Sequence, residues 1–93
     1  MTDDTTMNDV DYSMLPEHMQ GATRDYVERG WPPGEFLLAV LTNDLVAAFG
    51  RADATNVLFM HQWAMWLYNE CPSGAWGSVE KLQVWCLAHG EDK

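Results

Sequence analysis

Hydrophobic residues recur at three- and four-residue steps along most of this chain, a spacing typical of one face of an α-helix. Two connectors rich in proline and glycine interrupt the pattern, GWPPG at 30–34 and CPSGAWG at 71–77. No segment shows the strict apolar–polar alternation of a half-buried strand. The spacing therefore predicts an all-α fold, a compact single-domain bundle of about four helices joined by short loops.

The ends of these helices are predicted by residues with known capping preferences. We expect helices over about residues 16–29, 33–49, 54–70 and 79–89. Asp53 and Ser78 carry side-chain oxygens that accept hydrogen bonds at a helix N-terminus. Gly30 suits the left-handed conformation that often follows a helix.

The first twelve residues contain few apolar anchors. They are predicted to form a mobile, disordered acidic tail, residues 1–12, ahead of a helical domain over 13–90. The acidic residues of this tail are Asp3, Asp4, Asp9 and Asp11.

The formal net charge is −9, and the chain has only five lysines and arginines. Because such residues supply most of the affinity for nucleic acid, direct nucleic-acid binding is not expected. The acidity either serves solubility alone or forms a face that docks on a basic partner surface. The longest uncharged run, residues 54–69, is too short and too polar for a membrane span. The N-terminus lacks the features of a signal peptide, so we expect a cytoplasmic protein.

Two polar residues, Asn43 and Asp44, stand in the middle of the predicted second helix. On a helical wheel Asp44 falls at the centre of a wide apolar arc formed by Leu37, Leu41 and Ala48. Asn43 falls on one flank of that arc. A carboxylate buried in this position would need a partner, because an unpaired buried charge costs more than a small domain can tolerate.

Three partners for Asp44 are considered: Arg51 on the same face, Arg24 on the first helix, and backbone N–H groups near Ser78. In one interpretation Asp44 and Asn43 form a polar clamp that fixes helix packing. In the other they line a small polar pocket with Arg51 as the charged partner.

The predicted third helix has a second apolar face besides its core face, formed by Phe59, Trp63 and Trp66. Both faces could be buried in a four-helix domain. Alternatively, exposed aromatic residues would mark a partner interface or a homodimer interface. A third alternative is stacking on the base of a small nucleotide ligand. The core face is assigned to Val57, Met60, Ala64, Leu67 and Cys71.

No catalytic motif, nucleotide-binding glycine loop or metal-ligand spacing is present in the sequence. Cys71 and Cys86 lie in apolar helical patterns and are expected to be reduced core thiols. We therefore expect a protein that is not an enzyme and that uses neither a metal nor another cofactor.

The runs YVERGWPPGEFLLAVLTNDLVAAFGRADATN at 26–56 and LYNECPSGAWGS at 67–78 resemble small uncharacterised accessory proteins of tailed phages and prophages. The resemblance covers roughly residues 14–87. It implies expression inside an infected bacterial cell and no particular activity. The matching positions are Tyr26, Gly30, Pro33–Gly34, Phe36–Leu37, Asn43–Asp44, Ala52–Asp53 and Trp76–Gly77–Ser78.

Three functions are consistent with these features. The first is binding and modulation of a host protein, such as a host defence or nucleic-acid-handling complex with a basic surface. The second is binding of a small ligand, such as a nucleotide signal, and the third is a structural or assembly role in the phage. The candidate binding residues are Asn43, Asp44, Arg51, Phe59, Trp63, Trp66 and Trp76.

Overall fold

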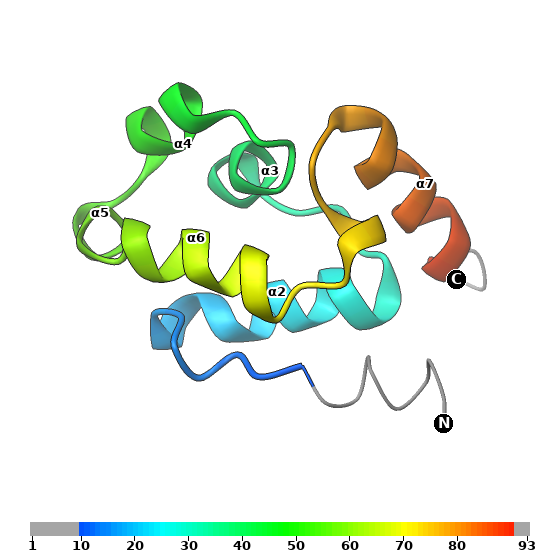
Figure 1. Ribbon diagram of the computed structural model, residues 1–93, viewed down its shortest axis with the longest axis horizontal. Coiled ribbons are helices and arrows are strands. Elements are labelled where there is room, and N and C mark those ends of the chain that lie inside the picture. Colours follow the sequence, from blue (N-terminus) through cyan, green and yellow to red (C-terminus); the bar gives the residue numbers. More distant parts are fainter. Residues whose placement is uncertain (1–9, 91–93) are drawn as a thin grey trace.

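The computed structural model describes residues 10–90, and all of their regular secondary structure is helical (Figure 1). The predicted all-α, compact bundle is therefore confirmed. The elements are α2 (Glu17–Arg29), α3 (Glu35–Leu41), α4 (Leu45–Arg51), α5 (Ala54–Leu58), α6 (Met60–Asn69), the 3₁₀-helix η1 (Ser73–Ala75) and α7 (Val79–His89).

The predicted second helix is wrong as a single element, because it is divided into α3 and α4. The chain turns at Asn43, whose φ of 65° lies in the left-handed region. Asparagine tolerates this conformation better than most residues with a Cβ atom. Asp44 then acts as the N-cap of α4, and its Oδ1 accepts a hydrogen bond from the Ala47 backbone N–H at 3.2 Å. Helices α3 and α4 pack against each other across this turn.

The predicted third helix is also divided, at Phe59, which ends α5 and precedes α6. Its backbone angles, φ −109° and ψ 16°, depart from helical values. The three predicted caps are confirmed: Asp53 accepts from the Asn56 N–H, Ser78 accepts from the Lys81 N–H, and Gly30 has a φ of 67°.

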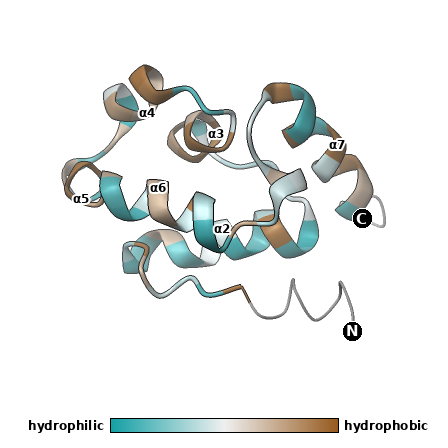
Figure 2. Cartoon of the chain, in the orientation of Figure 1, coloured by the Kyte–Doolittle hydropathy of each residue, from teal (hydrophilic) through white to brown (hydrophobic). Residues whose placement is uncertain are grey.

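The core lies between α2, α3 and α6, where the largest fully buried side chains include Tyr26, Leu37, Leu41, Trp63 and Trp66. Leu37 and Leu41 thus occupy the central positions that the helical wheel predicts. Figure 2 shows that hydrophilic residues are frequent along α2, whereas α4 and α5 are largely hydrophobic.

The segment before α2 also belongs to this core. Tyr12 and Leu15 are buried, and the Trp66 indole N–H donates to the Asp11 carbonyl oxygen at 3.0 Å. Tyr12, which the predicted tail includes, is therefore part of the core. Residues 1–9 of the predicted tail lie outside the described residues.

The C-terminal segment, from η1 through α7, is tied to the rest of the bundle by three hydrogen bonds that join distant parts of the chain. The Tyr26 hydroxyl donates to the Ala75 carbonyl oxygen at 2.7 Å, within the core. The Trp85 indole N–H donates to the Val27 carbonyl oxygen at 3.0 Å, and the Gly77 N–H donates to the Leu41 carbonyl oxygen at 2.8 Å. These bonds hold α7 beside the C-terminal end of α2, at the opposite end of the molecule from α4 and α5 (Figure 1).

Candidate binding site

Asn43 and Asp44 are both exposed, so the expectation of a buried carboxylate in the apolar arc is wrong. The turn at Asn43 changes the direction of the chain, and the wheel position of Asp44 in a continuous helix no longer applies. Ala48 remains buried, as predicted, because α4 packs on α3. The pair therefore forms the turn between two helices: Asn43 follows α3 and Asp44 caps α4. Asp44 needs no buried cation.

The two arginines considered as partners for Asp44 contact other residues. The Arg51 Nε lies 3.7 Å from a Glu35 carboxylate oxygen. The Arg24 Nε lies 3.9 Å from a Glu28 carboxylate oxygen, and its guanidinium covers the Tyr12 ring at 5.0 Å. None of the ion pairs within residues 10–90 includes Asp44.

A pocket of about 110 Å³ opens between α3, α4 and α6. Most of its lining is apolar. Three of the predicted site residues, Asn43, Asp44 and Trp63, belong to the lining, which is mainly apolar and so differs from the predicted polar pocket. Arg51 is not among the lining residues. The other lining residues are Ala39, Val40, Leu45, Ala48, Met60, Ala64 and Leu67.

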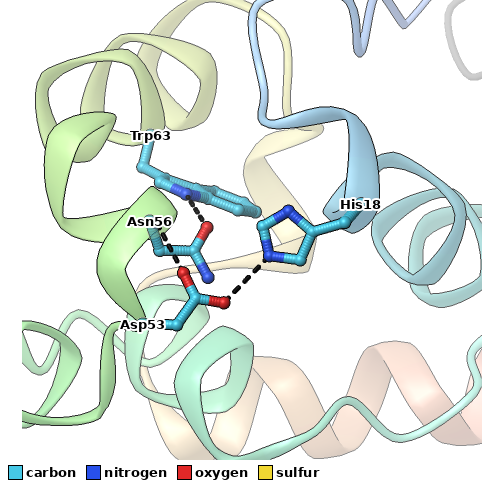
Figure 3. Close-up of polar contacts among 4 residues, drawn as sticks. All are labelled: His18, Asp53, Asn56 and Trp63. Carbon is cyan, nitrogen blue, oxygen red and sulfur yellow. Dashed lines mark hydrogen bonds and ion pairs between the residues drawn. The ribbon is translucent and has the colours of Figure 1, made fainter.

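A chain of polar contacts holds Trp63 in the wall of this pocket (Figure 3). The Trp63 indole N–H donates to the buried Asn56 Oδ1 at 3.2 Å, and the Asn56 backbone N–H donates to Asp53 Oδ1 at 2.6 Å. Asp53 Oδ2 lies 3.0 Å from the His18 Nε2 of α2. The backbone hydrogen bond from Asn56, aided by His18, lowers the pKa of Asp53 below its ordinary value of 3.8. The network links α2, α5 and α6, and it orients the indole ring.

The aromatic face of the predicted third helix is largely buried, so it does not form an exposed interface. Trp63 and Trp66 are 1% and 0% exposed, and their rings meet edge to face at a centroid distance of 6.3 Å. Phe59 and Trp76 are half-buried and pack against the core. Apart from the Trp63 surface that faces the pocket, these residues serve the core.

The exposed hydrophobic surface lies instead on α4 and α5, where sequence reasoning did not place it. On α4 the outward face presents Leu45 and Val46, which are 66% and 82% exposed, and the half-exposed Phe49. On α5, Leu58 is 78% exposed and Val57 is partly exposed. We call these five residues the α4–α5 surface. Leu45 also lines the pocket, so the surface and the pocket adjoin.

A signal for this surface was present in the sequence. Asparagine is favourable at a left-handed position, and the aspartate that follows it is favourable as an N-cap. A helix break at this pair changes the direction of the chain, so the next helix presents its apolar residues to different neighbours. In α4, Leu45, Val46 and Phe49 fall within about 100° of one another around the helix axis, and Val46 lies farthest from the buried Ala48, about 160° away.

Cys71 is buried and Cys86 is partly buried, and neither forms a disulfide. Burial raises the pKa of the Cys71 thiol to about 12, so this thiol stays protonated at neutral pH. Within residues 10–90 no group of three or more His, Cys, Asp or Glu side chains is arranged to hold a metal ion. None of the helices in that range has the length and apolar character needed to cross a membrane.

Comparison with known proteins supplies no further assignment: no family model, curated protein or solved structure matches this chain.

Proposed function

We propose that this protein is a protein-binding module that docks on a basic partner through the α4–α5 surface. The observation that carries the proposal is the exposure of α4. Of its seven residues only Ala48 is buried, while three large apolar side chains face solvent on one side of the helix. Exposed apolar side chains that gather on one face are typical of interaction sites.

The charge around this surface favours a basic partner. Asp44 and Asp53 stand at the N-termini of α4 and α5, and the basic residue of this region, Arg51, lies beside Glu35. The whole chain carries −9. An apolar centre with an acidic surround fits a partner that presents apolar side chains among lysines and arginines.

The resemblance to phage accessory proteins suggests where the protein would act, namely inside an infected bacterial cell. In that setting the partner is a host protein inside the infected bacterial cell, and a defence or nucleic-acid-handling complex has the required basic surface. The protein would act without catalysis or a cofactor, by covering that surface. A nucleotide suits the pocket less well, because the negatively charged Asp44 is among the lining residues and its charge repels phosphate.

The test compares the tagged wild-type protein with two variants in affinity purification from bacterial lysate. Val46→Asp places a charge on the α4–α5 surface. Leu87→Asp is the matched control, because Leu87 is 74% exposed on α7 at the other end of the molecule. We expect the wild type and Leu87→Asp to retain a basic protein that elutes as the salt concentration rises, and Val46→Asp to lose it.

Capture that survives Val46→Asp, or that does not respond to salt, would contradict the proposal. Solution mass measurement addresses the homodimer alternative. A wild-type dimer that Val46→Asp converts to a monomer would show that a second copy of the chain, and not a basic partner, covers this surface.

A further inference from the structure

We infer that the pocket beside Asp44 receives a lysine or arginine side chain of the bound partner, with its aliphatic stem inside the pocket and its charged end on the Asp44 carboxylate. This inference rests on the proposed function and specifies the chemistry of one anchor. It combines three observations: the apolar lining, the presence of the exposed Asp44 among the lining residues, and the absence of an ion pair to Asp44 within the described residues.

The size and lining of the pocket suit one alkyl chain. Its volume is about 110 Å³, and its walls are mainly aliphatic carbon with the indole of Trp63. A cavity of roughly 150 Å³ in another protein admits benzene, so this pocket is of the order needed for a single side chain. Because Trp63 is fixed by its hydrogen bond to Asn56, the wall is formed before any ligand arrives.

The polar part of the lining offers acceptors. Asp44 Oδ1 accepts the Ala47 N–H, which orients the carboxylate, and Oδ2 has no hydrogen-bond or ion-pair partner within residues 10–90. The Asn43 side chain likewise makes no hydrogen bond there, so its amide oxygen is a second acceptor. An ammonium or guanidinium group has several N–H donors and no acceptor. It is therefore complementary to a carboxylate beside an amide oxygen, both of which accept hydrogen bonds.

An anionic or a purely apolar side chain would complement only one part of the pocket, its apolar walls, and not the negatively charged Asp44. A carboxylate or phosphate would meet Asp44 at short range without a compensating cation, because Arg51 is held by Glu35. A leucine side chain would fill the apolar part but would make no ion pair with the exposed Asp44 carboxylate. Lysine and arginine combine a long apolar stem with a charged end, as this lining requires.

The test uses N-acetyl-lysine amide as the probe, with two analogues of similar shape: N-acetyl-norleucine amide, which lacks the ammonium group, and N-acetyl-glutamate amide. Binding is followed by two-dimensional NMR of the ¹⁵N-labelled protein, through the Trp63 indole N–H and the Asn43 and Asp44 backbone N–H signals. We expect the lysine probe to shift these signals at concentrations at which neither analogue does.

Two variants assign the effect. Asp44→Asn retains an N-cap but removes the charge, and it should weaken lysine binding roughly tenfold, the equivalent of about 1.4 kcal/mol. Ala64→Leu narrows the pocket from an exposed position of α6 and should abolish binding. Ala22→Leu, at an exposed position of α2, is the control and should leave binding unchanged.

Equal binding of the norleucine and lysine probes, or full lysine affinity in Asp44→Asn, would overturn the charge-based assignment. No shift with any probe would overturn the inference as a whole. The proposed function fails separately: if the captured partner is lost in Val46→Asp but retained in Asp44→Asn and Ala64→Leu, docking stands and the pocket assignment falls.

Discussion

The turn at Asn43 decides how α4 is placed, and replacing this residue tests that role directly. A φ of 65° is unfavourable for a residue with a Cβ atom, by about 1–2 kcal/mol for an ordinary side chain. Asparagine avoids part of this strain, whereas alanine does not. We therefore expect Asn43→Ala to lower the free energy of unfolding by about 1 kcal/mol.

Asn43→Gly separates the backbone from the side chain. Glycine adopts positive φ without strain but gives the unfolded chain more freedom, which costs about 0.4–1 kcal/mol. The two effects oppose each other, so Asn43→Gly should remain within about 0.5 kcal/mol of the wild type. The difference between the glycine and alanine variants measures the strain at this position.

Urea unfolding followed by tryptophan fluorescence provides the assay, because the core holds Trp63 and Trp66. A loss of 1 kcal/mol lowers the melting temperature of a domain of this size by about 4–8 °C. The slope of the unfolding free energy against urea should not change, since the same surface is exposed on unfolding.

Two results would refute this reasoning. The first is an Asn43→Ala variant as stable as the wild type with more helical circular dichroism, because alanine favours the continuous helix and the turn would then have been replaced by it. The second is an equal loss in the alanine and glycine variants, which would assign the effect to the Asn43 side chain and not to the backbone angle.

Other positions give further predictions. Tyr26→Phe removes a buried hydrogen bond to a carbonyl oxygen of η1, and chemical denaturation should show a loss of about 1–2 kcal/mol; an unchanged midpoint would contradict the role of that bond. Gly30→Ala should destabilise by about 2 kcal/mol or more, because a Cβ atom there would stand 2.7 Å from a backbone nitrogen at the end of α7 at a φ of 67°. The control is Gly21→Ala in α2, where the added Cβ atom has no neighbour within 4 Å; it should stabilise the protein by about 0.5–1 kcal/mol. Thermal melts of both variants measure the two changes. The pKa of Asp53 is lowered, mainly by the hydrogen bond from the Asn56 N–H. The ionised Asp53 therefore contributes to the free energy of unfolding in full above the ordinary pKa of 3.8, and this contribution is lost as the pH falls through the folded-state pKa. From about pH 5 to about pH 2 the wild type should therefore lose more stability than Asp53→Asn, and equal losses would contradict the assignment.

Local chemistry let the sequence predict the helical class and several helix ends. Ser78, Asp53 and Gly30 cap helices through bonds and angles within three or four residues, so their roles can be recognised without knowledge of the fold. The apolar centre at Leu37 and Leu41 is likewise buried where helical periodicity places it. Such features depend on neighbours along the chain, which the sequence contains.

The candidate site was only partly predictable, because its residues depend on the direction in which α4 leaves the turn. Asn43 and Asp44 were recognised as unusual, and the pocket they line was one of two interpretations. Their exposure does not follow from a helical wheel, because the wheel requires an unbroken helix and the chain turns at Asn43. A single left-handed residue changes the direction of the chain, and the spacing of apolar residues does not indicate where such a residue occurs.

The all-helical class, the caps that need only local hydrogen bonds, and an acidic charge that disfavours nucleic acid all follow from the residues alone. Only the packing of the helices sets which apolar side chains are covered. It buries Trp63 against Phe36 of α3 and Trp66 against Tyr12, and it leaves Leu45 and Val46 in solvent. The physical reason is that burial depends on which helices pack together, and apolar residues at helical spacing look the same whether a neighbour covers them or not.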